Sequence, residues 1–148
     1  MNRWLCLALV CAGLVVGCNS KPSTVQNVDD SHLRPLAMLW SQFTGQHQGK
    51  PPASKEEFQA FVKGLKPEVL SSMKIADVEK QFISERDNKP YVILYGQQAP
   101  AAGPGPSGGV MGYEQEGKDG KRIVAMSMGQ VRLVDEAEFQ KLVPGKSP

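Results

Sequence analysis

The chain holds few of the side chains that metal sites and active sites use most. Its 148 residues include two histidines and three cysteines. On one continuous helix His32 and His47 would lie about 22 Å apart, too far to share a metal ion. Asp29 and Asp30 stand beside His32, but nothing in the sequence predicts a preformed cavity around them. We therefore expect no metal and no cofactor.

Three other patterns resemble catalytic or ligand-binding motifs at first sight. The segment Ala125–Gly129 has the spacing of a relaxed nucleophile elbow, but an elbow needs a strand that turns into a helix, and here two strands are predicted. Gly103–Gly109 is rich in glycine, yet it lacks the lysine of a phosphate loop, and its prolines remove backbone donors. Adjacent acidic pairs favour helix starts or solvent; they are Asp29-Asp30, Glu56-Glu57 and Asp135-Glu136. No catalytic and no cofactor-binding residue is predicted.

The first residues have the pattern of an export signal. Arg3 supplies a positive charge, and Trp4–Val16 is a run of 13 apolar and small residues. A helix that spans a bilayer needs about 20 residues, so this run is too short. It has the length of the apolar region of a secretory signal peptide instead. We therefore leave residues 1–17 out of the fold.

The end of this run, Val15-Val16-Gly17-Cys18, resembles the lipobox of bacterial lipoprotein precursors. The resemblance implies cleavage between Gly17 and Cys18 and lipidation of Cys18, first on its thiol and then on the new amino group. It predicts a lipoprotein anchored in a membrane of the cell envelope, inner or outer. Another envelope protein is a candidate partner.

Cleavage at Gly17 would remove the other two cysteines with the leader. Cys18 would carry lipid, so the mature chain would have no free thiol and no disulfide. Its 131 residues suffice for one domain. It would carry 16 basic and 15 acidic side chains. Nucleic-acid binding needs a clear excess of positive charge, which this near balance does not supply, so we expect no nucleic-acid partner.

The mature chain divides into a tether, one domain and a tail. Residues 18–30 are polar and predict a flexible tether. Residues 31–143 form the domain, and 144–148 a short tail. A helix is expected over Ser31–Gln48, with Ser31 as its N-cap and apolar residues at spacings of three and four. A second helix is expected from Ser54 to Leu65, because Ser54 and Glu57 form a capping box. A helical turn is expected over Glu68–Met73.

In the second half of the domain the residue pattern changes to one that is typical of β-strands. Strands are expected at Tyr91–Tyr95, Val110–Gln115, Lys121–Met128 and Val131–Val134, with a flexible Pro/Gly loop over 97–109. Asp135 should cap a closing helix that ends at Leu142. The fold class is therefore α+β: N-terminal helices packed on a small antiparallel β-meander. Helical spacing favours a core role, not a ligand platform, for the aromatic residues Trp40, Phe43, Phe58 and Phe61.

Two further resemblances concern larger parts of the chain. The order of elements in Gly112–Val143 resembles the C-terminal sheet of pseudopilin-like proteins, but the pilin-type N-terminal helix is absent, so assembly into a pilus is not implied. The segments His47–Pro52 and Glu56–Phe58 are similar to those of small uncharacterised bacterial lipoproteins. That similarity implies no activity.

These observations favour a lipid-anchored, non-enzymatic interaction or structural module of the cell envelope. One alternative is a lipoprotein that binds a small ligand, which would need a pocket ringed by a few polar groups. Another is a hydrolase whose site the sequence does not reveal, which would need a titratable group perturbed in a cleft.

Overall fold

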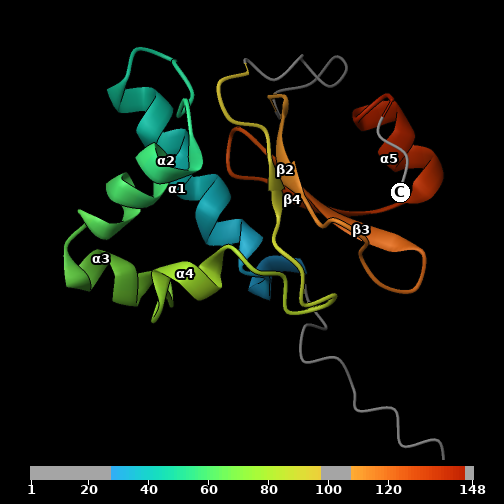
Figure 1. The fold of residues 1–148 in the computed structure, drawn as a ribbon, viewed down its shortest axis with the longest axis horizontal. Helices are drawn as coiled ribbons and strands as arrows, with labels where there is room; N and C mark the ends of the chain where they lie inside the picture. The colour runs from blue at the N-terminus through green and yellow to red at the C-terminus, as the bar shows by residue number, and fades with distance from the viewer. Residues whose placement is uncertain (1–27, 98–107, 146–148) are drawn as a thin grey trace, which may run out of the picture.

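A computed structural model describes residues 28–97 and 108–145. Within these ranges the fold is α+β, as predicted: helices come first, an antiparallel sheet follows, and a helix closes the chain (Figure 1). The leader, Gly17, Cys18 and most of the tether and of the Pro/Gly loop lie outside the described residues.

The helices match the predicted ones closely. They are η1 (Val28–Asp30), α1 (Leu33–Gln46), α2 (Lys55–Lys63), α3 (Pro67–Ser72), α4 (Val78–Gln81) and α5 (Glu136–Leu142). Helix α4 was not predicted from the sequence, and Val28–Asp30 were assigned to the tether. These three residues instead form a 3-10 helix, and Val28 packs against the core.

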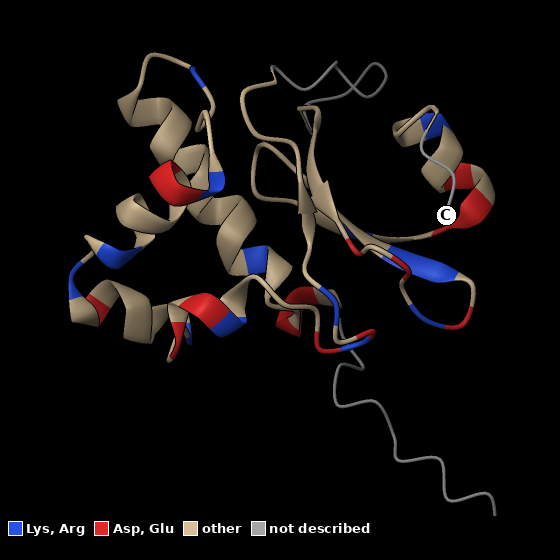
Figure 2. Ribbon diagram, in the orientation of Figure 1, with Lys and Arg blue, Asp and Glu red and all other residues tan. Residues whose placement is uncertain are grey.

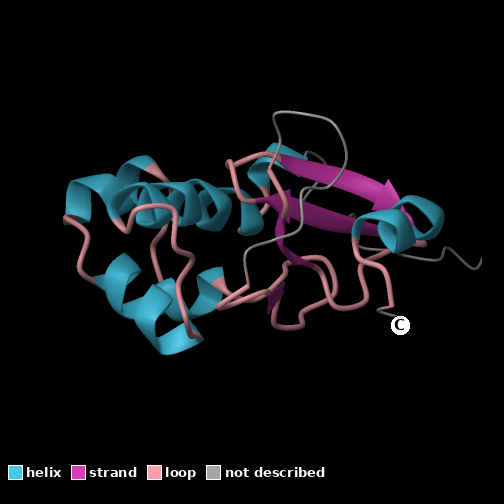
Figure 3. Cartoon of the chain, turned by 90° about the horizontal axis from the view of Figure 1, so that it is seen from above, coloured by secondary structure: helices cyan, strands magenta, loops and turns pink. Residues whose placement is uncertain are grey.

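The sheet is a meander of four antiparallel strands in chain order. They are β1 (Val92–Ile93), β2 (Val110–Tyr113), β3 (Lys121–Met126) and β4 (Val131–Asp135). Helix α1 packs on one face of the sheet and α5 on the other, as Figures 1 and 3 show. Side chains of β3 alternate accordingly, because successive residues of a strand face opposite sides. Ile123 and Ala125 join the core beneath α1, whereas Val124 and Met126 join the core beneath α5.

Aromatic side chains fill the core between α1, α2 and the sheet. Trp40 and Phe58 meet edge to face with ring centroids 5.4 Å apart. Phe43 is also buried, which confirms the core role predicted for these three residues. Phe61 is half-buried at the edge of the same cluster, where it meets Phe43 edge to face at 5.3 Å.

The helix caps agree with the sequence in two cases and differ in one. Ser54 Oγ accepts a hydrogen bond from the Glu57 amide at 3.2 Å, but the Glu57 carboxylate accepts from the Ala53 amide, one residue before the expected one. Asp135 Oδ1 accepts from the Glu138 amide at 2.8 Å. At α1 the predicted cap is wrong. The N-cap is His32, without a side-chain cap, and the carbonyl of Ser31 accepts from the amide N–H of Arg34.

A buried carboxylate ties the turn before β1 to the β2–β3 hairpin. Glu114 is completely buried. Its oxygens accept hydrogen bonds from Ser84 Oγ at 2.8 Å, Arg86 Nη1 at 3.0 Å and the Ile123 amide at 2.7 Å. Burial raises the pKa of Glu114, and these donors offset part of that rise. These hydrogen bonds hold the Ser84–Arg86 turn against β3 and the residue that follows β2.

Asp87 connects the same turn before β1 to the tip of the β2–β3 hairpin. Its carboxylate accepts from the amides of Gly117 at 2.9 Å and Glu116 at 3.0 Å, and also from the Lys89 amide. Burial by itself would raise the pKa of Asp87, but the hydrogen bonds outweigh it and hold the pKa below its ordinary value. Gly117 has a φ of +74°, and a Cβ there would lie 2.3 Å from the Lys121 carbonyl oxygen, so this turn requires glycine.

Candidate functional site

The two histidines sit at opposite ends of α1. At its C-terminal end the His47 ring stacks on Phe43 with centroids 3.9 Å apart, and its Nδ1 lies 2.8 Å from the Phe43 carbonyl oxygen. Both contacts are local and hold the end of the helix. They give His47 a structural role.

His32 is held by the segment between α4 and β1. Its Nδ1 lies 3.0 Å from the carbonyl oxygen of Ile83, and its Nε2 lies 2.9 Å from Glu85 Oε1. Gln81 is buried and donates from Nε2 to the His32 carbonyl at 2.7 Å. Residues about 50 positions apart in the chain are thus joined at the start of α1.

A pocket of about 490 Å³ opens beside this histidine, and we name it the His32 pocket. Its walls come from η1, the first two turns of α1, the end of α3 and the segment 81–85. Two pairs of acidic and basic side chains in its lining contact each other: Arg34 with Asp29, and His32 with Glu85. Its apolar wall consists of Pro35, Met38 and Met73.

Three residues that line the His32 pocket have polar side-chain groups without a partner among the described residues. Ser31 is 2% exposed, and its hydroxyl is the one buried side-chain polar atom there without a hydrogen bond. The carboxylate of Asp30 and the ammonium group of Lys74 form no ion pair within residues 28–97 and 108–145. A buried hydroxyl without a partner costs free energy, so a polar atom from outside the protein would be stabilised here.

Lys74 holds an unusual backbone conformation at the end of α3. Its φ is +58°, in the left-handed region that favours glycine. Its amide donates to the Ser71 carbonyl at 3.0 Å, and the Ile75 amide donates to the Leu70 carbonyl at 2.9 Å. This is the Schellman pattern, in which glycine usually occupies the position of Lys74. The lysine side chain is thereby placed on the rim of the pocket.

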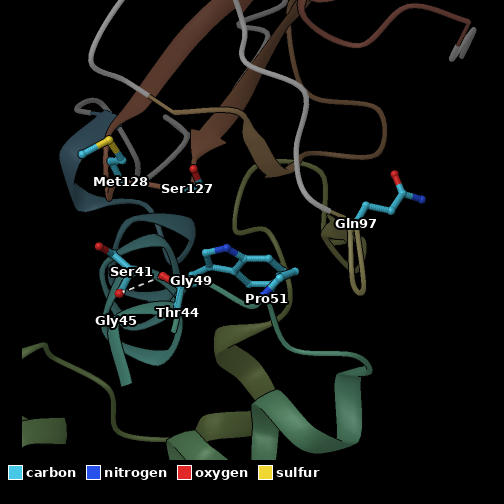
Figure 4. A pocket seen from close by; sticks show the side chains of 9 residues that line it. Ser41, Thr44, Gly45, Gly49, Pro51, Gln97, Ser127 and Met128 are labelled. Carbon is cyan, nitrogen blue, oxygen red and sulfur yellow. Dashed lines mark hydrogen bonds between the residues drawn. The ribbon is translucent and has the colours of Figure 1, made fainter. Parts of the chain in front are cut away.

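A second pocket, also of about 490 Å³, lies at the other end of α1 (Figure 4). Ser41, Thr44 and Gly45 of α1 line one side, and Ser127 and Met128 of the turn after β3 line another. We name it the Ser127 pocket. None of its polar side chains is charged, and neither histidine lines it. A third pocket borders His47 and Glu57, whose side chains already have local roles at the ends of α1 and α2.

The structure does not assemble a nucleophile at Ser127. The chain passes from β3 through the turn at Ser127–Gln130 into β4, so the strand–helix elbow that the chemistry requires is absent at this position. The acidic pairs occupy the expected helix starts: Asp135 caps α5, and Glu56 and Glu57 lie in the first turn of α2. Residues 103–107 of the glycine-rich loop lie outside the described residues.

Charge on the described domain is mixed. Lys and Arg alternate with Asp and Glu over the helices and the hairpin, as Figure 2 shows. Within the described ranges no cluster of three or more His, Cys, Asp or Glu could hold a metal ion. No described helix is long and apolar enough to cross a bilayer.

Most of the His32 pocket was not predicted from the sequence. Asp29, Asp30 and His32 are near one another in the chain and Ser31 was predicted to be a helix cap, but no sequence pattern places Lys74 or Glu85 beside them. No spacing rule connects the start of α1 with the end of α3, because tertiary packing brings them together. Comparisons of the chain with protein-family models, curated proteins and solved structures find no match.

Proposed function

We propose that this protein is a lipid-anchored component of the cell envelope whose domain acts by binding and not by catalysis. The observation that carries the anchor is the sequence Val15-Val16-Gly17-Cys18 at the end of a 13-residue apolar run. A lipid on Cys18 would leave nine residues between the anchor and Val28, the first residue that the structure describes.

The anchor is tested by replacing Cys18. With an alkyne fatty acid fed to the expressing cells, Cys18→Ala should lose the label and remain uncleaved, because its thiol is the proposed lipid acceptor. Cys11→Ala is the matched control: it removes a cysteine of the leader and should keep both label and cleavage. Equal labelling of Cys18→Ala and the unaltered chain would contradict the anchor.

Binding without catalysis is supported by the arrangement of the titratable groups. Each histidine contacts a backbone carbonyl, and His32 also pairs with Glu85. No serine or threonine hydroxyl within residues 28–97 and 108–145 is hydrogen-bonded to either histidine. An adjacent base such as histidine, within hydrogen-bond reach, is one common way to activate a serine or threonine nucleophile.

The purified protein should therefore hydrolyse no ester, phosphate or peptide substrate of a broad panel above background, and it should hold no stoichiometric metal. Turnover assays and elemental analysis measure both. Turnover that survives repurification and disappears when one polar residue is replaced would overturn this reading.

A second candidate function is the binding of a small ligand by the anchored domain. The His32 pocket favours it, because this pocket combines a buried hydroxyl without a partner with an apolar wall. Ligand sites commonly pair an apolar lining with a few placed polar groups.

A further inference from the structure

We propose that the His32 pocket binds a zwitterionic small molecule, an apolar α-amino acid or a short apolar peptide, with its carboxylate toward Lys74 and Ser31 and its ammonium group toward Asp30. The proposal rests on the ligand-binding candidate above and is independent of the lipid anchor.

The charges of the pocket determine the class of ligand. Its four other acidic and basic side chains contact one another in two pairs, Arg34 with Asp29 and the His32 ring with Glu85. One ammonium group, on Lys74, and one carboxylate, on Asp30, remain without an ion-pair partner among the described residues. A ligand with one negative and one positive group complements both. An anion or a cation would leave one of the two unmatched.

Ser31 supplies the observation that distinguishes this pocket from an ordinary charged surface. Ser31 is one of the residues that line the pocket, and its hydroxyl is buried without a hydrogen-bond partner in the described structure. It lies next to the N-terminus of α1, a helix of 14 residues that begins without a side-chain cap. The uncapped start of a helix favours a negative group. The carboxylate of the ligand therefore belongs on this side.

The side chain of the ligand should be apolar. Pro35, Met38 and Met73 line the pocket, and Met38 is 45% exposed although it lies on the helix that carries the core. Methionine adapts to side chains of different shape. Leucine, methionine or phenylalanine fits this wall better than a charged or a small amino acid.

The first test uses the full chain purified in detergent and isothermal titration calorimetry. Leucine, phenylalanine and a leucine dipeptide should each give saturable binding with one site per chain. N-acetyl-leucine lacks the ammonium group and leucinamide lacks the carboxylate, so each should bind at least about tenfold more weakly. If N-acetyl-leucine binds as well as leucine, the pocket takes an anion and the proposal is wrong. If none of the zwitterions binds at millimolar concentration, the proposal is equally wrong.

Two substitutions separate binding from folding. Lys74→Gly removes the proposed carboxylate partner and also relieves a left-handed lysine, so it should raise the thermal midpoint by a few degrees while it weakens leucine binding about tenfold or more. Ser31→Ala removes a buried hydroxyl without a partner, so it too should leave the fold at least as stable and weaken binding.

The matched control is Asp119→Gly, which relieves a left-handed residue (φ +54°) in the β2–β3 hairpin, where it does not line the His32 pocket. It should gain stability and bind leucine like the unaltered chain. Unchanged leucine binding in both Lys74→Gly and Ser31→Ala would place the ligand elsewhere and overturn the proposal. Equal labelling of Cys18→Ala and the unaltered chain would contradict the anchor alone, so the two failures can be told apart.

Discussion

Arg86→Met should destabilise the domain by about 3–5 kcal/mol at neutral pH, the typical cost of leaving one charge of a buried ion pair without its partner. Arg86 lies 3.0 Å from the carboxylate of Glu114, which is completely buried, and it also donates to the Lys118 carbonyl at 3.1 Å. Without the guanidinium group, Glu114 would keep two hydrogen bonds but no positive charge. Chemical unfolding followed by far-UV circular dichroism measures the effect.

The pH dependence identifies the cause. Burial raises the pKa of Glu114 in the folded state, so the folded protein binds this proton more tightly than the unfolded chain. The contribution of Glu114 to stability is then greatest below the ordinary carboxyl pKa and falls as pH rises toward the raised value. Loss of Arg86 raises that pKa further, so the deficit of Arg86→Met should shrink as pH is lowered.

A double substitution controls for packing. Arg86→Met with Glu114→Gln removes the buried charge together with its partner, and it should recover much of the stability lost in Arg86→Met. A deficit that is independent of pH and persists in the double variant would mean that Arg86 acts through packing and its bonds to the hairpin carbonyls.

Phe58→Ala should cost about 3–5 kcal/mol, a large share of the 5–15 kcal/mol that holds a typical domain together. Phe58 is fully buried and meets Trp40, Phe43 and Phe82 edge to face. A cavity at this position would open where α1, α2 and α4 converge. The midpoint of urea unfolding should fall accordingly.

Phe61→Ala is the matched comparison, one helical turn away on α2. Phe61 is half-buried, so its truncation removes less apolar surface from the core and should cost about 1–2 kcal/mol. The ratio of the two effects is the result to measure. Equal midpoints for the two variants would show that Phe61 contributes as much to the core as Phe58.

The parts of the fold that the sequence predicted are those governed by local rules. The Ser54 cap is confirmed because it depends on residues three positions apart. The strands from Val110 onward are confirmed because glycine turns separate them and neighbours in the chain pair directly. Helix α4 was missed because four residues are too few to show a helical period.

What the sequence could not show depends on distant residues. Glu114 has the appearance of a solvent-facing position at the end of a strand, yet Ser84 and Arg86 cover it completely. Serine is a common helix cap, but the N-cap of α1 is His32, and the Ser31 hydroxyl forms no capping hydrogen bond. The His32 pocket arises from tertiary packing, which joins the start of α1 to the end of α3.

The order β1-β2-β3-β4 has a consequence for the kinetics of folding. Each strand pairs with its neighbour in the chain, so β2, β3 and β4 can form by closing short loops, which is entropically cheap and fast. Helix α1 packs on strands that begin more than 60 residues after its last residue. During synthesis α1 therefore emerges well before the sheet on which it packs, and we expect the docking of α1 on the sheet to be the slower, long-range step.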